Sequence, residues 1–233
     1  MCIDKSMSHG SAEHGLHAHA FRTPRLYDLS ASILFLGRRR ATFQTLIVAA
    51  GVRAGQRVLD VGCGTGYLVR LLAEAVGPRG MAVGIDPSPE MLAHARRQAR
   101  RASNCQFQAG SAQTLDFLDD RFDVVVSSLA MHHVPEDMRL LAVREMLRVL
   151  RPGGRVLLAE VQLPRHGLGL RLLGRLHGLD RMARRVPDLD PLLAQAGFTD
   201  IRGGEAPPWL RYAQAVKPAQ ASPGEESVSQ PAS

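Results

Sequence analysis

The sequence predicts an α/β fold, a three-layer sandwich in which a mostly parallel, seven-stranded sheet lies between two layers of helices. After Gly51, short apolar stretches alternate with stretches of helical periodicity. The alternation stops near the C-terminus, where residues 198–205 and 209–216 read as two strands joined across Pro207-Pro208. The chain of 233 residues is 45% hydrophobic, which is enough to bury a proper core.

The predicted elements are short. Strands are expected at 57–62, 81–86, 105–110, 122–129 and 155–161, before the two C-terminal strands. Helices are expected at about 65–76, 88–101, 136–150 and 188–196, and residues 24–50 also have a helical pattern. Ligands of parallel sheets bind beyond the carboxyl ends of the strands, so polar residues at those ends are the candidates for a site.

The domain is expected to span residues 23–217, between polar tails at 1–22 and 218–233 that lack core residues and are expected to be disordered. The histidines of the first tail are irregularly spaced, so metal binding there is the less favoured alternative. The three cysteines are scattered and in no metal-ligand spacing, so no metal site is predicted.

Composition also bears on location and partners. The sequence contains no run of 18 apolar residues and no basic-then-apolar signal pattern, so no membrane span or leader is expected. The odd number of scattered cysteines favours a reduced, cytoplasmic compartment. A net charge of +7 favours nucleic acid, an acidic membrane surface or an anionic substrate, and it does not choose among them.

The stretch 57–66 predicts a strand, a glycine turn and the start of a helix. This arrangement brings backbone N–H groups and a helix N-terminus close to a small polar ligand. The glycines do not fit G-x-G-x-x-G, because the third glycine would fall at Tyr67 or Val69, and no G-K-[ST] follows. The pattern D-x-G-x-G-x-G resembles the first motif of the class I S-adenosylmethionine (SAM) dependent methyltransferases.

In that family, this acid and this turn hold the methionine end of SAM. The resemblance therefore implies that four residues bind the cofactor: Asp60, Gly62, Gly64 and Gly66. The alternative is a tight strand-to-helix turn without a ligand. Three alternate glycines cost stability unless a close approach requires them, which favours a ligand.

Asp86 ends the second predicted strand, 20 residues after Gly66 by their numbers (86 − 66 = 20). A carboxylate there can accept hydrogen bonds from both ribose hydroxyls of the cofactor, with Pro87 beside it. The alternative is that Asp86 only caps the following turn. Ser88 and Pro89 predict the cap and the first residue of the next helix.

The third strand is followed by Ser111 and Ala112. In the resembling family, an acid or amide often occupies the position of Ser111 and binds the adenine amino group. A serine hydroxyl accepts one hydrogen bond, so the contact is expected to be weaker and to pass in part to the backbone at Ala112.

The fourth strand and the loop beyond it, residues 122–133, resemble the same region of the family and place Ser128 at the cofactor. Enzymes that methylate adenine amines carry D/N-P-P-Y here, whereas this chain has Ser-Ser-Leu-Ala. The sequence also lacks a Pro-Cys nucleophile, which excludes the cytosine C5 route. His132 and His133 are candidate general bases, and the alternative is that they pack or orient the loop.

Two further segments belong to the resemblance. Tyr27 and Asp28 form an aromatic–acid pair that often lines the site in this family, although Tyr27 could equally pack at a helix start. Residues 145–158 match the family's helix, Pro-Gly-Gly turn and buried strand, where Pro152 and Gly153 are expected to end the helix. The resemblance runs from about 27 to 217 and is closest to the ubiquinone/menaquinone-biosynthesis type. It implies a Rossmann-like sheet with an antiparallel C-terminal edge pair.

Residues 162–187 interrupt the alternation of strands and helices. In the resembling fold, an insertion here builds the acceptor site. Its part at 165–186 has an apolar stripe flanked by arginines, which predicts a basic amphipathic lid with peripheral membrane contact. The alternative is a core-packing helix with a solvated basic face.

Together these features predict an enzyme that transfers the methyl group of SAM to a small, apolar acceptor such as a quinone, lipid or secondary metabolite. The transfer is expected to be an in-line displacement, and no nucleic-acid partner is expected. One alternative is an RNA or protein methyltransferase, favoured by the positive charge. A second alternative is a SAM-binding protein without transferase activity.

Overall fold

The computed structural model describes residues 35–162 and 185–219, together with Pro24, Asp28, Leu29, Ala31, Ser32 and Ala183. Seven strands form one sheet in the order β3-β2-β1-β4-β5-β7-β6. Their bounds are β1 (Arg57–Val61), β2 (Met81–Asp86), β3 (Cys105–Ala109), β4 (Phe122–Ser128), β5 (Leu150–Val161), β6 (Thr199–Ala206) and β7 (Leu210–Val216).

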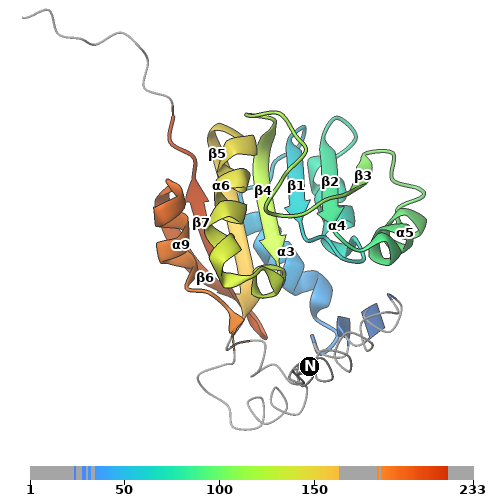
Figure 1. Ribbon diagram of the computed structural model, residues 1–233. Coiled ribbons are helices and arrows are strands. Elements are labelled where there is room, and N and C mark those ends of the chain that lie inside the picture. The colour runs from blue at the N-terminus through green and yellow to red at the C-terminus, as the bar shows by residue number, and fades with distance from the viewer. Residues whose placement is uncertain are drawn as a thin grey trace, which may run out of the picture.

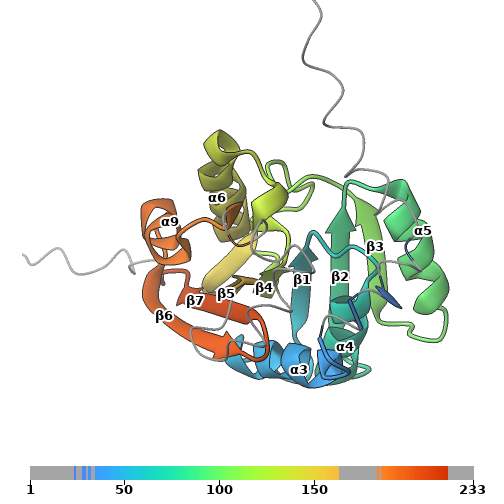
Figure 2. The same ribbon diagram turned by 90° about the horizontal axis from the view of Figure 1, so that it is seen from below.

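The described helices cover both faces of the sheet. They are α3 (Arg39–Ala49), α4 (Tyr67–Val76), α5 (Pro89–Gln98), α6 (Arg139–Val149) and α9 (Leu189–Ala196), with short 3₁₀ turns η1 (Met131–His133) and η2 (Glu136–Met138). Figure 1 shows α6 in front of the sheet and α3 behind it. Figure 2 shows α3 and α4 on one side of the strands and α6 and α9 on the other. The predicted three-layer arrangement is confirmed.

The first five strands are parallel, and β7 runs antiparallel between β5 and β6. This confirms the predicted parallel sheet and its antiparallel C-terminal pair. The strand order reverses at β1, which lies between β2 and β4. The carboxyl ends of β1 and β4 therefore flank the crevice where ligands of such sheets bind.

The core has two halves, one on each face of the sheet. Along β1, Val58 belongs to the half covered by α3 and α4, whereas Leu59 and Val61 belong to the half covered by α6 and α9. Alternate residues of a strand point to opposite faces. Asp60 therefore occupies a position on the α3/α4 face that would otherwise continue the core.

The structure differs from the predicted boundaries around Pro152 and Gly153. Helix α6 ends at Val149, three residues before Pro152, and β5 begins at Leu150 because Phe122 pairs with Leu150. Gly153 has φ of +73°, and its N–H donates to Lys217 O at 3.0 Å. The Pro-Gly-Gly turn is therefore an irregularity at the start of β5 and does not end the helix.

The helical pattern at 24–50 is also interrupted. Residues 35–37 form a turn, in which Leu36 has φ of +53°, and α3 begins after this turn at Arg39. Leu29 and Leu36 of this segment are exposed, so these two leucines do not pack into the core.

Several predictions fall outside the described residues. These are Tyr27, both predicted tails apart from residues 218 and 219, and most of the insertion at 162–187, including nearly all of the basic segment 165–186. Among the helices that the structure describes, none has the length and hydropathy needed to cross a membrane.

Candidate cofactor and catalytic site

The glycine turn after β1 is held by hydrogen bonds to the last residues of β2. The N–H groups of Gly62 and Cys63 both donate to Ile85 O, at 2.9 and 2.8 Å. Gly64 N–H donates to Asp86 Oδ2 at 2.8 Å. The structure therefore brings together the two acids at the strand ends, Asp60 and Asp86, as the sequence predicted.

The three glycines of the turn have different neighbours, although all have positive φ. A Cβ on Gly62 would collide with that of Ala130, and a Cβ on Gly66 would lie 2.6 Å from the Phe107 ring. A Cβ on Gly64 would meet no other atom within 4 Å. Packing explains Gly62 and Gly66, and Gly64 is the open position where a ligand can approach the backbone.

A small cavity of about 50 Å³ lies beside this turn, at the carboxyl ends of β1 and β4. Its polar lining includes Arg39, Asp60, Thr65 and Ser128. A water molecule occupies about 30 Å³ of liquid, so the cavity has the size of a small polar group. It is a candidate pocket for the charged end of a longer ligand.

Asp60 is 2% exposed, and no described residue donates a hydrogen bond to its carboxylate. Burial, with a smaller contribution from the charge of Asp86, raises the pKa of Asp60 from 3.8 to about 8. The carboxyl is therefore mostly protonated at neutral pH until a cation reaches it.

Arg39 enters the same cavity from α3. Its Nη1 donates to Asp28 Oδ1 at 2.9 Å, and its guanidinium carbon lies 3.9 Å from the centre of the Tyr67 ring. Arg39 Nε is buried without a partner, as is Ser128 Oγ. Leaving a buried polar atom unpaired costs about 1–3 kcal/mol. The cavity therefore holds a carboxyl, a guanidinium N–H and a hydroxyl that all lack partners within the described chain.

Asp28 connects this cavity to the N-terminal segment. Besides Arg39, its carboxylate accepts a hydrogen bond from Thr65 Oγ1 at 2.7 Å and lies 3.1 Å from His94 Nε2 on α5. Asp28 thus fixes the guanidinium of Arg39 and the hydroxyl of the glycine turn at the same time.

Asp86 is half-buried, and Pro87 beside it is exposed. Besides the bond from Gly64, Asp86 accepts Ser88 N–H through Oδ1 at 2.9 Å. Burial raises the pKa of Asp86, and the two backbone hydrogen bonds oppose that shift. Each oxygen accepts only one of these bonds, so each retains a free lone pair for a ribose hydroxyl. The predicted cap is confirmed, because Ser88 Oγ accepts Met91 N–H at 3.2 Å.

Ser111 and Ala112 follow β3 and lie away from the Asp60 cavity. Ser111 is exposed and hydrogen-bonds the side chain of Gln113. Ala112 is half-buried and packs against the core on the α6 side. The structure does not bring Ser111 to the residues around Asp60.

The two histidines after β4 have different surroundings. His132 is buried, and its Nδ1 lies 2.8 Å from Glu160 Oε2, near the end of β5. His133 is exposed and has no carboxylate partner among the described residues. Burial, followed by the charge of His132, lowers the pKa of His133.

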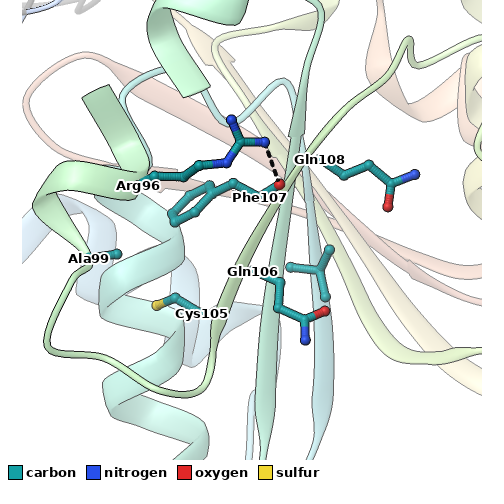
Figure 3. A pocket seen from close by; sticks show the side chains of 7 residues that line it. Arg96, Ala99, Cys105, Gln106, Phe107 and Gln108 are labelled. Atoms are coloured by element: carbon teal, nitrogen blue, oxygen red, sulfur yellow. Dashed lines mark hydrogen bonds between the residues drawn. The ribbon is translucent and has the colours of Figure 1, made fainter. Parts of the chain in front are cut away.

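A larger hollow of about 400 Å³ lies at the β3 edge of the sheet. Figure 3 shows Arg96 and Phe107 on one side of the strand and Gln106 and Gln108 on the other. Arg96 Nη2 donates to Phe107 O at 2.8 Å. Cys105 also lines this hollow, but burial raises the pKa of its thiol. A thiol with a raised pKa is a poor nucleophile, so the hollow offers no catalytic group.

Sequence reasoning missed several of these residues. Arg39 lies in a run of three arginines, and nothing in the sequence distinguishes it from Arg38 and Arg40. Glu160 had a usable signal, since it is the single charge in the apolar stretch 156–161. Among the described residues, no three His, Cys, Asp or Glu side chains are grouped as metal ligands would be.

Comparison with known proteins identifies the domain. Residues 58–154 match the model of a methyltransferase domain. The chain is 41% identical over 143 residues to the ubiquinone/menaquinone biosynthesis C-methyltransferase UbiE of Ectopseudomonas mendocina, covering 59% of this chain and 54% of that protein. It is 35% identical over 140 residues to the demethylmenaquinone methyltransferase of Shouchella clausii, covering 59% of each. The chain thus spans less than two thirds of the length of these curated relatives.

Solved structures show the same fold. A SAM-dependent methyltransferase from Aquifex aeolicus has a TM-score of 0.63 at 20% identity, with 75% of this chain and 89% of that chain covered. The [4+2]-cyclase SpnF has a TM-score of 0.59 at 21% identity, with 77% and 80% covered. Phosphoethanolamine N-methyltransferase 2 of Haemonchus contortus, solved with S-adenosyl-L-methionine, has a TM-score of 0.59 at 18% identity, with 76% and 52% covered. Residues 58–154 are therefore similar to a methyltransferase domain, and the fold is one that SAM-dependent methyltransferases share.

Proposed function

We propose that this protein binds SAM at the carboxyl ends of β1, β2 and β4 and transfers its methyl group to a small, apolar acceptor. The observation that carries the proposal is the set of unpaired polar groups around one small cavity beside the glycine turn: Asp60, Arg39 Nε and Ser128 Oγ. Buried polar groups in native proteins are normally paired, so this set is best explained by a ligand.

The methionine end of SAM fits these groups. Its ammonium is a cation for the Asp60 carboxylate, and its carboxylate is an acceptor for Arg39 Nε, while Ser128 Oγ can serve either. Charge-assisted hydrogen bonds of this kind are the strong ones. The open face of Gly64 allows the ligand to approach the backbone of the turn.

We assign the remaining contacts by position. Asp86, with Pro87 beside it, would bind the ribose hydroxyls. Ser111 and the backbone of Ala112 would reach the adenine, since they follow Gly110, whose N–H donates to Asp86 O at 3.3 Å. Gly62 and Gly66 shape the turn. Tyr27 lies outside the described residues, and its contact with the cofactor stays a prediction.

When bound, SAM supplies an activated methyl group on a sulfonium. The residues of this chain then hold the acceptor in line with the methyl carbon and exclude water. Such positioning supplies roughly 7–11 kcal/mol of a reaction barrier. No covalent enzyme intermediate is required.

The acceptor we propose is a quinone-type molecule in its reduced form. The names of the relatives, ubiquinone/menaquinone biosynthesis C-methyltransferase and demethylmenaquinone methyltransferase, favour it. An apolar acceptor also fits peripheral membrane contact through the arginine-rich segment 165–186. The free thiols of Cys63 and Cys105 fit a reduced, cytoplasmic setting.

Two observations support other functions. The cyclase SpnF shares this fold, so the fold by itself does not establish methyl transfer, and a SAM-binding protein without transferase activity is a second candidate. The net charge of +7 favours RNA or protein as the acceptor.

The test is a methyl-transfer assay with labelled SAM. Reduced demethylmenaquinone with a short isoprenoid side chain should become labelled, and S-adenosylhomocysteine should form in equal amount. Label in RNA or in a peptide, with none in the quinol, would favour the polymer alternative. Saturable SAM binding without S-adenosylhomocysteine formation from quinols, phenols, amines or polymers would favour the protein without transferase activity.

A further inference from the structure

We propose that His132, oriented by Glu160, is the general base of the reaction and takes a proton from a hydroxyl group of the acceptor. The inference rests on the proposed function and deepens it. It restricts the acceptor to molecules that carry an acidic O–H, such as a phenol or the reduced, hydroquinone form of a quinone.

Glu160 makes three contacts with one short turn. The residue is fully buried near the end of β5. Its Oε1 accepts the N–H groups of Met131 at 2.7 Å and His132 at 3.3 Å, and its Oε2 lies 2.8 Å from His132 Nδ1. A carboxylate accepts hydrogen bonds, so Nδ1 carries the proton in this contact and Nε2 has the free lone pair.

That lone pair has no hydrogen-bond partner among the described residues. His132 is 7% exposed, and its Nε2 is buried without a hydrogen bond. A histidine that served only to anchor the turn would gain nothing from an unpaired ring nitrogen, which costs about 1–3 kcal/mol. The two backbone bonds from Met131 and His132 already anchor the turn to Glu160. The buried Nε2 can therefore accept a hydrogen bond from a ligand. A hydroxyl group of the methyl acceptor would be such a donor.

The pair lies at the edge of the sheet where the cofactor site lies. Ser128 and Leu129 line the Asp60 cavity, and η1, which contains His132, begins two residues after Leu129. Strands β4 and β5 are parallel neighbours, with Ser128 paired to Ala159, the residue before Glu160. His132 therefore lies close in the chain to two residues that line the Asp60 cavity, but it does not line that cavity itself.

His133 is the neighbouring titratable group, with its ring centre 4.0 Å from that of His132. Arg185 adds a positive charge that contributes to lowering the pKa of His133. His133 has no carboxylate to orient it among the described residues, and it is less buried than His132. The structure therefore separates the two histidines, which the sequence left equivalent.

Protons and electrons balance in this methyl transfer without an oxidant or a reductant. The acceptor O–H bond breaks and its proton moves to His132 Nε2. The electron pair, on oxygen or on the conjugated ring carbon, forms the bond to the methyl carbon, and the pair of the broken S–C bond stays on sulfur. For methylation at carbon, the ring proton then passes to solvent water, and the oxygen takes back the proton held on His132 Nε2, which restores the aromatic hydroxyl. A base of this kind contributes about 10²–10⁴-fold to the rate.

The test uses the full chain, SAM and reduced demethylmenaquinone with a short side chain. His132→Asn places an amide N–H near the position of Nδ1, so it keeps the bond to Glu160 and removes Nε2. Turnover should fall about 10²–10⁴-fold, while calorimetric SAM affinity and the thermal midpoint stay close to wild type. The acid limb of the kcat/KM–pH profile should disappear in His132→Asn. His133→Asn should lose less turnover than His132→Asn and keep that limb.

Glu160→Gln tests the positioning role. The glutamine keeps an oxygen that accepts the backbone N–H groups, but its amide no longer requires a proton on His132 Nδ1. The variant should therefore have a lower kcat and an altered pH profile, with little change in SAM affinity. Histidine ¹⁵N NMR of the wild type should show a protonated Nδ1 and a free Nε2 on His132.

The outcomes are distinct. Wild-type turnover of the quinol with equal turnover by His132→Asn overturns the base while leaving methyl transfer intact. A proton on Nε2 in the free enzyme, or turnover of amines with none of hydroxylated acceptors, also overturns it. Absence of SAM binding by the wild type overturns the proposed function itself, and this inference falls with it.

Discussion

Two buried carboxylates, near the ends of the strands on either side of β4, differ in how completely they are paired. Glu160 on β5 accepts two backbone N–H groups and contacts a histidine. Asp60 on β1 is almost as deeply buried and has no hydrogen-bond donor among the described residues. The chain completes the surroundings of Glu160 and leaves those of Asp60 incomplete.

The difference shows what each acid does. A buried carboxylate with a full set of partners stabilises the structure that holds it and positions the groups bound to it. A buried carboxylate without donors destabilises the free protein unless a ligand supplies the missing cation. This difference supports the proposals that Glu160 orients a catalytic group and that Asp60 binds the cofactor directly. Substitution of Glu160 should therefore lower stability with little change in SAM affinity, whereas substitution of Asp60 should lower SAM affinity without loss of stability.

The largest expected effect is on folding. Glu160→Ala removes the acceptor of two backbone N–H groups and of the His132 ring in a buried site. We expect the free energy of unfolding to fall by about 3–5 kcal/mol. Urea denaturation followed by circular dichroism measures it, and Glu160→Gln should lose less. A loss below about 1 kcal/mol for Glu160→Ala would contradict the structural role.

Asp60→Asn should act on the cofactor. Removal of the charge from one charged hydrogen bond costs about 1.5–3 kcal/mol, which is roughly a 10- to 150-fold weaker Kd for SAM by calorimetry. The free protein should be as stable as wild type, or more stable. Asp123→Asn is a matched control, because Asp123 accepts Arg57 N–H at 2.8 Å near the amino end of β4, at the opposite edge of the sheet. An equal loss of affinity in both variants would show that the effect of Asp60 is indirect.

Because the pKa of Asp60 is raised, both the stability of the free protein and its binding of SAM should depend on pH. Its pKa in the folded protein is about 8 against an ordinary value of 3.8. The folded state therefore binds more protons than the unfolded state, and stability without SAM should be lost as pH rises from about 4 to 8. At pH 7, SAM binding should release a proton, which appears as a buffer-dependent enthalpy in calorimetry. Asp60→Asn should lack that release, and wild-type binding without a proton change would contradict the assignment.

The smallest expected effect concerns the glycine turn. Gly64→Ala meets no neighbouring atom and costs only its left-handed backbone conformation, about 1–2 kcal/mol. Gly66→Ala has the same backbone cost and also collides with the Phe107 ring and Ala95. Thermal denaturation should therefore rank Gly66→Ala as the less stable variant. If the two lose equal stability, Gly64 is not the open position of the turn.

The sequence predicted the fold well because its signals are local. Strand and helix periodicity, the Ser88 cap and the two strand-end acids each depend on residues close together in the chain. The boundary near Pro152 was wrong because the pairing of Phe122 with Leu150 extends β5 backward, and that pairing is non-local.

The site was predicted only in part. Asp60 and the glycines belong to one contiguous motif and Asp86 ends the next strand, so local patterns were enough to predict that they lie together, and their role at the cofactor stays a prediction. Arg39 reaches Asp28 across 11 residues, and His132 reaches Glu160 across 28, so neither pair forms a pattern in sequence. Tertiary packing alone distinguishes His132 from His133 and makes Arg39 part of the cofactor cavity.

The central claim is that the unpaired groups around Asp60 bind the amino-acid end of SAM. The most direct measurement compares S-adenosylhomocysteine with 5′-methylthioadenosine, which lacks that end, by calorimetry on the wild type and on Asp60→Asn. The account predicts that the wild type strongly prefers S-adenosylhomocysteine and that the variant loses most of the preference. Equal affinity of the wild type for both ligands, or a preference that survives in Asp60→Asn, would contradict it.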